Sequence, residues 1–252
     1  MKIALVGYGR MGHAVEVEAR AAGHQVVARF DPNQPSADAG SLADALDRAD
    51  VAVDFTVAAE VAGTAAAAAG AGVGLVVGTT GWGEETDAAL REAGRDVGIV
   101  YGPNFSEGVH VFLRLAREAA RLVDALGSYD VHLHETHHRH KRDHPSGTAR
   151  RIADVLVETL GSKDRWRPGP PDGVADPDTL YVTSARTGEV PGIHVVGLEG
   201  AHDGIELRHD ARGREGFARG AVRAAEWVLG RRGVYTFEEM MDDLLGTGEH
   251  DE

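Results

Sequence analysis

The sequence contains 252 residues, carries a formal net charge of −14 at pH 7 and has no cysteine. This length suits one large domain or two small ones, and a hydrophobic content of 42% is enough for buried cores. The lack of cysteine excludes disulfides, thiolate catalysis and thiolate-bound metal clusters. The acidic balance argues against nucleic acid as a partner, because nucleic-acid binding needs a basic face.

The N-terminal residues show no signal for export or membrane insertion. No apolar run approaches the roughly 20 residues that cross a bilayer. Met1 and Lys2 lead directly into the apolar residues 3–6, without the long apolar region and cleavage site of a signal peptide. We therefore expect a cytoplasmic protein with no membrane partner.

A glycine-rich motif follows the first predicted strand, at residues 2–6, and precedes a helical segment that extends to about Ala22. Gly7 allows a tight turn, Gly9 lets the backbone approach a pyrophosphate, and Gly12 allows the helix to lie close to the strand. The motif G-x-G-x-x-G consists of Gly7, Tyr8, Gly9, Arg10, Met11 and Gly12. Because it lies between a strand and a helix, it predicts a dinucleotide-binding site.

A second predicted strand, at residues 25–30, ends at Asp31. A carboxylate at this distance, roughly 20 residues after the glycines, accepts hydrogen bonds from an adenosine ribose diol. The alternative is a turn residue before Pro32. No arginine stands at either of the next two positions to bind a 2′-phosphate, so we expect NADH to be preferred and NADPH tolerated. Arg10 and Arg29 leave this open, since either could reach the phosphate.

Further strands, predicted at 51–56, 73–77 and 98–101, alternate with predicted helices at 41–48, 58–71 and 84–93. This alternation predicts an α/β fold with a Rossmann-like, doubly wound parallel sheet, whose ligand lies outside the carboxyl ends of the strands. Polar, glycine-rich or turn residues lie at the carboxyl ends of these three strands or directly after them. They are Asp54, Phe55, Thr56, Gly78, Thr79, Thr80, Gly81, Gly102, Pro103, Asn104, Phe105 and Ser106. Such ends can be ordinary turns, but their repetition at one edge favours a cofactor site.

The pattern changes after Asn104. A long amphipathic helix is predicted at 109–126, and a connection without periodicity is predicted at 161–179. Strands predicted at 180–184, 194–198 and 204–209 have no helices between them, which indicates an antiparallel or mixed sheet in a second, α+β domain.

Two final helices, predicted at 217–229 and 237–245, could cover the first sheet, and residues 246–252 are expected to form a disordered tail. We therefore predict a dinucleotide-binding domain at 1–104, completed by 214–252. A substrate-binding and oligomerisation domain is predicted at 105–213.

The stretch 130–152 concentrates histidine and basic residues immediately before a helix start. Apolar and polar residues alternate from Tyr129 to His134, which predicts a half-buried strand. Pro145 then excludes helix at His144, and hydroxyl groups beyond it can cap a helix. We expect a strand, a charged loop and a helix N-terminus.

Three interpretations compete for this stretch. Residues 134–138 fit the H-E-x-x-H zinc motif, but that motif binds metal on a continuous helix, so we expect no metal site. A solvated basic loop is the second. We favour an anion site, because basic side chains lie beside a helix N-terminus whose N–H groups at Gly147 and Thr148 can bind a carboxylate or phosphate. The basic residues are Arg139, Lys141 and Arg142.

The chain resembles the 4-hydroxy-tetrahydrodipicolinate (dihydrodipicolinate) reductase family over nearly its full length. Residues 135–149, ETHHRHKRDHPSGTA, resemble the family signature E-x-H-H-x-x-K-x-D-x-P-S-G-T-A. Supporting matches lie at residues 54–56, 78–81, 103–106, 108, 186–188, 192–194 and 217–222. The sequence departs from the family pattern at Gly102, where alanine is usual, and at His110, where asparagine is common.

The resemblance implies an enzyme of lysine and diaminopimelate biosynthesis that reduces the cyclic product of aspartate semialdehyde and pyruvate with hydride from a nicotinamide cofactor. It implies a homotetramer built through the second domain's sheet. By similarity, His137 is the proton donor, and Lys141 stabilises developing negative charge or shares the proton delivery. The dicarboxylate substrate is expected to contact His138, Lys141, Ser146, Gly147 and Thr148.

Two alternatives remain at this point. Another two-domain amino-acid dehydrogenase would have the same cofactor edge but no need for a dicarboxylate clamp. A non-catalytic nicotinamide-binding sensor would keep the glycine motif but have no reason to retain His137 with Lys141.

Overall fold

The computed structural model describes residues 1–34 and 36–246, which form two compact units. The first contains residues 1–107 and the chain from Arg214 onward, and the second contains Gly108–Gly213. The sequence placed the first boundary after Asn104, close to the observed one after Glu107. Most of the predicted C-terminal tail lies outside the described residues. None of the described helices is long and apolar enough to span a membrane.

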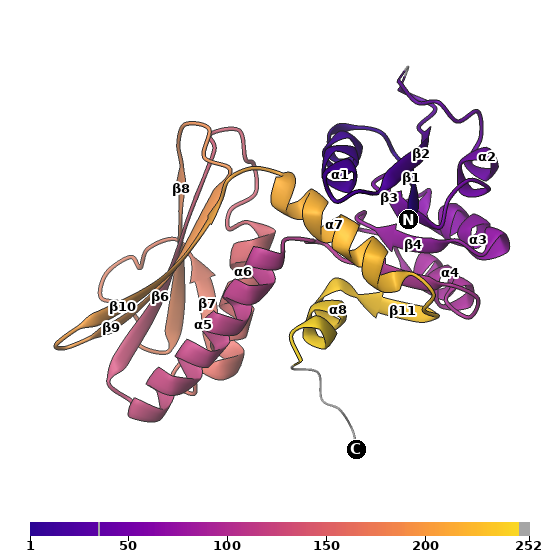
Figure 1. The fold of residues 1–252 in the computed structure, drawn as a ribbon. Helices are drawn as coiled ribbons and strands as arrows, with labels where there is room; N and C mark the ends of the chain where they lie inside the picture. The colour runs from indigo at the N-terminus through magenta and orange to yellow at the C-terminus, as the bar shows by residue number, and fades with distance from the viewer. Residues whose placement is uncertain (35, 247–252) are drawn as a thin grey trace. The chain divides into compact units, whose positions relative to one another are not determined.

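The first unit contains a six-stranded sheet in the order β11-β5-β4-β3-β1-β2, with every pair of neighbours parallel (Figure 1). The strands are β1 (Lys2–Val6), β2 (Gln25–Phe30), β3 (Val51–Asp54), β4 (Gly74–Val77), β5 (Gly98–Tyr101) and β11 (Gly233–Thr236). The strand order changes direction between β1 and β3. In a doubly wound sheet, this switch point is where a ligand binds.

Helices cover both faces of this sheet because successive strand residues point to opposite sides. The helices are α1 (Arg10–Ala21), α2 (Leu42–Leu46), α3 (Val61–Ala71), α4 (Glu84–Ala93), α7 (Glu215–Val228) and α8 (Phe237–Leu244). Ile3 and Leu5 belong to a core with residues of α1, α7 and α8, whereas Ala4 and Val6 belong to a core with residues of α2, α3 and α4. The C-terminal helices α7 and α8 thus pack in the same core as β1.

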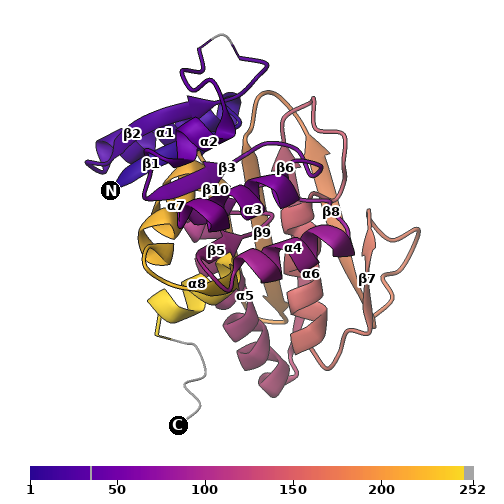
Figure 2. The same cartoon turned by 90° about the vertical axis from the view of Figure 1, so that its right-hand side faces the viewer.

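The second unit contains a mixed five-stranded sheet in the order β10-β9-β6-β8-β7. Its elements are α5 (Glu107–Leu126), β6 (Tyr129–His137), α6 (Gly147–Thr159), β7 (Arg165–Pro168), β8 (Thr179–Arg186), β9 (Gly192–Gly200) and β10 (Gly204–Ala211). β9 is antiparallel to β6 and β10, whereas β8 is parallel to β6 and β7. Buried residues of α5 and α6 form one core with β6, β8 and β9, and Figure 2 shows both helices along the sheet.

The sequence analysis missed two strands. The connection predicted without periodicity at 161–179 contains β7, and the segment between the last two helices contains β11. Both are four residues long and lie at the edge of their sheets. β3, β4 and β5 are equally short, but they are mostly buried and apolar, whereas β7 is largely exposed and β11 is half-buried. The two missed strands therefore lack the apolar run that predicts a buried strand.

Candidate functional site

A cavity of about 500 Å³ lies where β1, β2 and β3 end, at the switch point of the first sheet. Five predicted cofactor residues line it, namely Gly7, Gly9, Asp31, Phe55 and Thr56. The lining also includes residues that the sequence analysis did not single out, among them Leu42, Val57, Glu60, Gly63 and Thr64. Several of these lie in α3 or just before it. The sequence signal that could have identified them is a polar residue at the start of the helix that follows β3.

The glycine motif has the backbone geometry that its spacing predicted. Gly7 has a φ of +83°, and a Cβ there would lie 2.8 Å from the carbonyl carbon of Phe55. A Cβ on Gly12 would lie 2.5 Å from the Gly7 oxygen, whereas one on Gly9 would meet nothing within 4 Å. Gly7 and Gly12 must therefore be glycine because other backbone atoms lie where a side chain would be. Gly9 instead borders open space and lines the cavity.

Asp31 connects the end of β2 to the glycine motif. Its Oδ2 accepts a hydrogen bond from the Tyr8 amide at 2.9 Å, and its Oδ1 accepts one from the Asn33 amide at 2.9 Å. The second bond is the side-chain turn that a residue before Pro32 can form, so Asp31 is a turn residue that also lines the cavity. Each oxygen keeps a lone pair for a ligand hydroxyl.

Arg29, which the sequence left open as a phosphate ligand, is engaged within the protein. Its Nε donates to Glu16 at 2.9 Å, its Nη2 also contacts Glu16, and its Nη1 lies 2.6 Å from Asp38. The hydrogen bond from Arg29 lowers the pKa of Glu16 to about 2. The Arg29 side chain is 14% exposed and lies over the Tyr8 ring. Arg10, in contrast, is exposed.

The other predicted cofactor residues do not line this cavity. They are Tyr8, Arg10, Met11, Gly12, Gly78, Thr79, Thr80, Pro103, Asn104 and Phe105. Two of them nevertheless contact residues that line the cavity. A Cβ on Gly78 would lie 2.0 Å from the Phe55 ring, and Thr79 donates to the Thr56 carbonyl at 3.1 Å. The Phe105 side chain is buried in the core, 4.7 Å from Phe237 between ring centroids.

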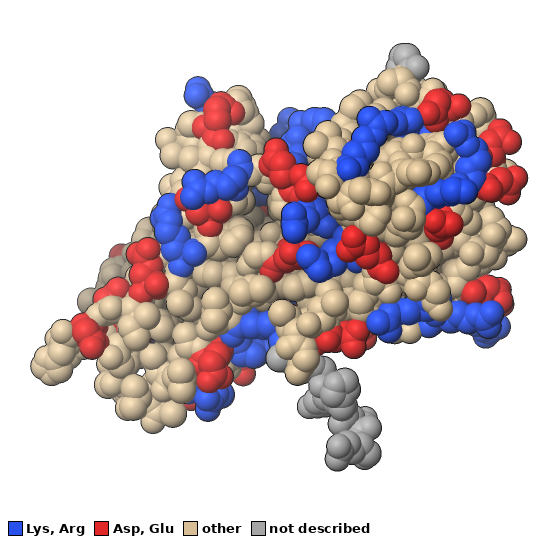
Figure 3. All heavy atoms as spheres, viewed as in Figure 1, with Lys and Arg blue, Asp and Glu red and all other residues tan. Residues whose placement is uncertain are grey.

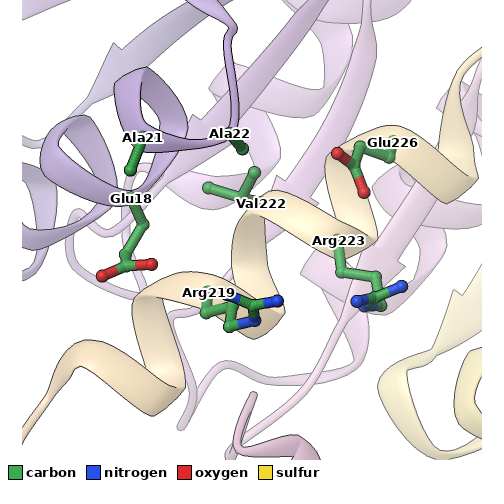
Figure 4. A pocket seen from close by; sticks show the side chains of 7 residues that line it. All are labelled: Glu18, Ala21, Ala22, Arg219, Val222, Arg223 and Glu226. Atoms are coloured by element: carbon green, nitrogen blue, oxygen red, sulfur yellow. The ribbon is translucent and has the colours of Figure 1, made fainter.

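A smaller cavity, of about 260 Å³, lies between α1 and α7 (Figure 4). Its lining residues are Glu18, Ala21, Ala22, Arg219, Val222, Arg223 and Glu226. Glu226 lies 2.8 Å from His24, and Arg223 contacts Glu107, so two of its charged residues already have partners. None of the predicted site residues lines it, and we assign it no ligand.

In the second unit, β6 carries the central residues of the signature. Val131, Leu133, Glu135 and His137 are buried in alternation, so the strand continues beyond the apolar residues that predicted it. Register places Glu135 opposite Ser184 of β8 and His194 of β9. A polar cluster therefore extends the apolar core at the end of the strand.

Glu135 is fully buried and accepts hydrogen bonds from three donors. The Ser146 amide donates at 3.1 Å, the Ser184 hydroxyl at 2.8 Å and the Arg186 guanidinium at 2.7 Å. Burial alone raises the pKa of this carboxyl, but its contacts with His137, Ser146, Arg186 and Ser184 outweigh burial and hold the pKa below its usual range. Glu135 is thus an anion inside the core.

His137 lies beside this carboxylate and is 7% exposed. Its Nδ1 lies 2.9 Å from the carbonyl oxygen of Pro191, and because a carbonyl only accepts, Nδ1 carries a hydrogen. Its Nε2 lies 3.4 Å from Glu135 Oε2, within ion-pair distance but without hydrogen-bond alignment. Nε2 is thus buried and forms no hydrogen bond with the described residues.

His194 completes the cluster from β9. Its ring centroid lies 5.3 Å from that of His137, and its Nε2 lies 3.2 Å from the Ser146 hydroxyl. Burial, followed by the nearby charge of His137, lowers the pKa of His194 to about 4. His194 is therefore neutral at pH 7, and its Nε2 shares a hydrogen bond with the Ser146 hydroxyl.

The residues that fit the H-E-x-x-H motif do not lie on a continuous helix. Its residues lie on a strand or just beyond it, and His134 bonds to Thr183 at 2.8 Å, while His137 bonds to Pro191. Glu135, His137 and His194 do bring three potential metal-ligand atoms within 4.8 Å of one another. The Arg186 guanidinium lies 2.7 Å from Oε1 of the same carboxylate, so a cation of the protein already adjoins this cluster.

Acidic side chains pair with part of the basic loop at residues 139–142, which lowers its net positive charge. Lys141 lies 2.9 Å from Asp143, and Arg139 lies 3.6 Å from Glu189. Figure 3 likewise shows basic and acidic side chains interspersed on the face in view. Intramolecular pairing therefore offsets part of the patch, and the Lys141 side chain keeps 22% of its surface exposed.

The helix N-terminus predicted after Pro145 is present. Ser146 caps α6, because its hydroxyl accepts from the Ala149 amide at 3.1 Å, and α6 begins with Gly147 and Thr148. The same Ser146 joins this helix start to the buried cluster through its amide bond to Glu135. His138 follows β6 directly and is half-buried. The predicted anion residues thus lie on one loop and helix start, adjoining His137 along the chain.

A Rossmann-like unit with a switch-point cavity, joined to a mixed-sheet unit with a histidine and lysine loop, defines the class of two-domain nicotinamide-dependent oxidoreductases. Residues 1–105 match the family description "Dihydrodipicolinate reductase, N-terminus", and residues 108–241 match "Dihydrodipicolinate reductase, C-terminus". The chain therefore belongs to the dihydrodipicolinate reductase family, whose members are NAD(P)H-dependent oxidoreductases.

Curated relatives match over nearly their full length. The 4-hydroxy-tetrahydrodipicolinate reductase of Alkalilimnicola ehrlichii is 41% identical, with 97% of this chain and 98% of the relative covered. That of Christiangramia forsetii is 35% identical, with 97% and 99% covered. A solved dipicolinate-bound dihydrodipicolinate reductase from Paenisporosarcina has the same fold, with a TM-score of 0.79 at 24% identity over 95% of this chain and 99% of that one.

Proposed function

We propose that this chain reduces 4-hydroxy-tetrahydrodipicolinate to tetrahydrodipicolinate with hydride from a nicotinamide cofactor, in lysine and diaminopimelate biosynthesis. The observation that carries the proposal is the buried Glu135–His137 pair followed directly by the Lys141 loop, in a chain that matches both halves of the family. A sensor needs no such pair, and a dehydrogenase for other amino acids needs no dicarboxylate clamp.

His137 is the proposed proton donor. Loss of the 4-hydroxyl group as water leaves an unsaturated ring. Hydride addition to this ring then leaves negative charge on it, which a proton from a general acid neutralises. Charge-assisted N–H···O bonds are normally about 2.7–2.9 Å long, so the 3.4 Å between His137 Nε2 and Glu135 is long for one. The carboxylate can stabilise the proton on Nε2 electrostatically without holding it in a short hydrogen bond.

The dicarboxylate is proposed to bind at the loop and helix start that follow β6. Lys141 provides a cation, His138 an imidazole, and the α6 terminus provides N–H and hydroxyl donors at Ser146, Gly147 and Thr148. The Ser146 hydroxyl already caps the helix and contacts His194. In this proposal the substrate carboxylate therefore approaches the backbone N–H groups of the first turn of α6, at Gly147 and Thr148. Lys141 must exchange Asp143 for a substrate carboxylate or contact both.

NADH is the proposed preferred cofactor, bound at the switch-point edge of the first unit by the residues predicted from the sequence. Asp31 lines the cavity and would repel a 2′-phosphate, while its free lone pairs suit a ribose diol. Arg29 is engaged with Glu16 and Asp38, so its charge is already compensated. Exposed Arg10 remains for NADPH, which supports tolerance of that cofactor rather than preference.

We also propose a cytoplasmic homotetramer assembled through the second unit's sheet. The core helices α5 and α6 pack on the face that carries Val131 and Leu133. The opposite face carries partly buried residues such as Tyr181 and Ile193, which suit contact with another copy. Light scattering after size-exclusion chromatography measures the oligomeric state directly.

The experiment that tests the function is NADH oxidation at 340 nm with and without substrate generated from aspartate semialdehyde and pyruvate. His137→Gln should lower kcat by roughly a hundredfold, as expected for loss of a general acid, and remove one limb of the pH profile. Lys141→Met should impair KM and kcat together, because its cation acts in both ground and transition states. Oxidation independent of this substrate, or a kcat for His137→Gln within about threefold of the parent, contradicts the proposal.

A further inference from the structure

The ring of His137 lies between two fixed acceptors. The Pro191 carbonyl holds Nδ1 at 2.9 Å, and Glu135 Oε2 faces Nε2 at 3.4 Å. Gly192 closes one side of the ring, since a Cβ there would lie 2.7 Å from His137 Cε1. A carbonyl at one nitrogen and a carboxylate at the other both favour a hydrogen on the nitrogen that faces them. Each ring nitrogen of His137 therefore faces an acceptor.

We propose that Glu135 is a positioning residue that fixes the ring of His137 and favours a hydrogen on its Nε2. This inference rests on the proposed role of His137 as proton donor. Glu135 itself is fully buried and needs no contact with substrate or cofactor to act. The backbone at Ser146 and the side chains of Ser184 and Arg186 fix the carboxylate in turn.

Cations from β8 and from the loop oppose the effect of Glu135. Arg186 of β8 shares the carboxylate, at 2.7 Å from Oε1, and so reduces the negative charge that His137 experiences. Lys141 of the loop adds a second cation, which Asp143 at 2.9 Å partly offsets. The stabilisation that remains for the His137 proton is therefore a balance, in which removal of Glu135 and removal of Arg186 have opposite effects.

The groups on β9 and β10 add little charge. Burial and the charge of His137 lower the pKa of His194 to about 4, and burial lowers the pKa of His209. The His194 and His209 rings lie 6.3 Å apart between centroids, so they extend the cluster away from His137 as neutral rings. Among the described residues, Glu135 is thus the carboxylate that lies within ion-pair distance of the His137 ring.

The test is the pH profile of kcat in Glu135→Gln, which keeps the shape of the side chain and removes its charge. Activity requires protonated His137, so it falls as pH rises through the alkaline limb. An opposite charge at this distance shifts such a limb by about one to three pH units, and we expect Glu135→Gln to move it to lower pH by at least about one unit. The affinity for NADH should not change.

Three further variants separate the effect of charge from that of structure. Glu189→Gln removes a carboxylate that is 74% exposed on the same unit, and it should leave the limb in place. Glu135→Asp keeps the charge and should return the limb part of the way toward that of the parent. Arg186→Gln removes the opposing cation and should move the limb to higher pH.

The outcomes separate this inference from the proposed function. If His137→Gln removes the limb but Glu135→Gln leaves it unmoved, the donor stands and the role of Glu135 is overturned. If His137→Gln retains the limb, the proposed donor is wrong, and the inference is wrong with it. Should Glu135→Gln fail to fold, Arg186→Gln decides: a limb that stays or moves to lower pH overturns the inference, and one that moves to higher pH supports it.

Discussion

Substitution of Gly192 by alanine tests whether the position of the His137 ring controls the chemical step. A Cβ at Gly192 would lie 2.7 Å from His137 Cε1 and 3.2 Å from Nδ1. Carbon atoms in contact are normally about 3.5–4.0 Å apart, so the ring must move by roughly 1 Å. Pro191 and Glu135 face its two nitrogens, and any such movement disturbs at least one of these contacts.

A misplacement of about 1 Å at a reacting group can cost on the order of a hundredfold in rate. We therefore expect kcat of Gly192→Ala to fall by about a hundredfold, with unchanged NADH affinity. Stopped-flow or steady-state NADH oxidation at 340 nm measures the first quantity, and fluorescence titration with NADH measures the second.

The matched control is Gly204→Ala on β10. A Cβ there would lie 2.7 Å from the carboxylate of Glu199, the same separation as at Gly192, but Glu199 is exposed and can rotate away. This variant should keep kcat within roughly threefold of the parent. If Gly192→Ala also stays within this range while His137→Gln does not, the ring position does not limit the reaction and the reasoning is refuted.

Three further predictions follow from the same structure. Thr148→Val should raise the KM or Kd for the dicarboxylate by roughly tenfold to a hundredfold, the effect of losing a hydrogen bond to a charged group, without changing NADH affinity. Comparison of kcat/KM should favour NADH over NADPH, and a strong preference for NADPH would show that Asp31 has been misinterpreted. Glu16→Gln should reduce the free energy of unfolding at pH 7 by about 1–3 kcal/mol. Because Arg29 lowers the folded pKa of Glu16 from 4.5 to about 2, this difference should be fully present above pH 4.5 and narrow as the pH falls toward 2, as urea unfolding at pH 7 and at lower pH would show.

The alternation of strands and helices in residues 1–104 predicted the first sheet because each element there has its own sequence pattern. The Rossmann-like sheet and the mixed second sheet are both confirmed. The edge strands β7 and β11 were not predictable in this way. β7 contains Trp166 between two arginines and ends in Pro168, and β11 pairs with a neighbour more than a hundred residues earlier in the chain.

The predicted site residues were identifiable by motif, but their charge partners were not. Arg29 is neutralised by Glu16, 13 residues earlier, and Arg186 reaches Glu135 across 51 residues. Sequence spacing at this range carries no information on contact, because only the fold brings the side chains together. The sequence therefore overestimated how freely Arg29 can reach a phosphate.

The burial of the proposed acid follows from the strand pattern once the pattern is continued. The alternation that turns Val131 and Leu133 into the core also turns Glu135 and His137 inward, since the period of a strand is two. Register then places an apolar level, in which Leu133 faces Val182 and Val196, next to a polar level, in which Glu135 faces Ser184 and His194. Polar residues at core positions are costly unless they satisfy one another. A charged residue that continues the inward face of an apolar strand therefore indicates a functional cluster, and its partners are to be sought at the same level of the neighbouring strands.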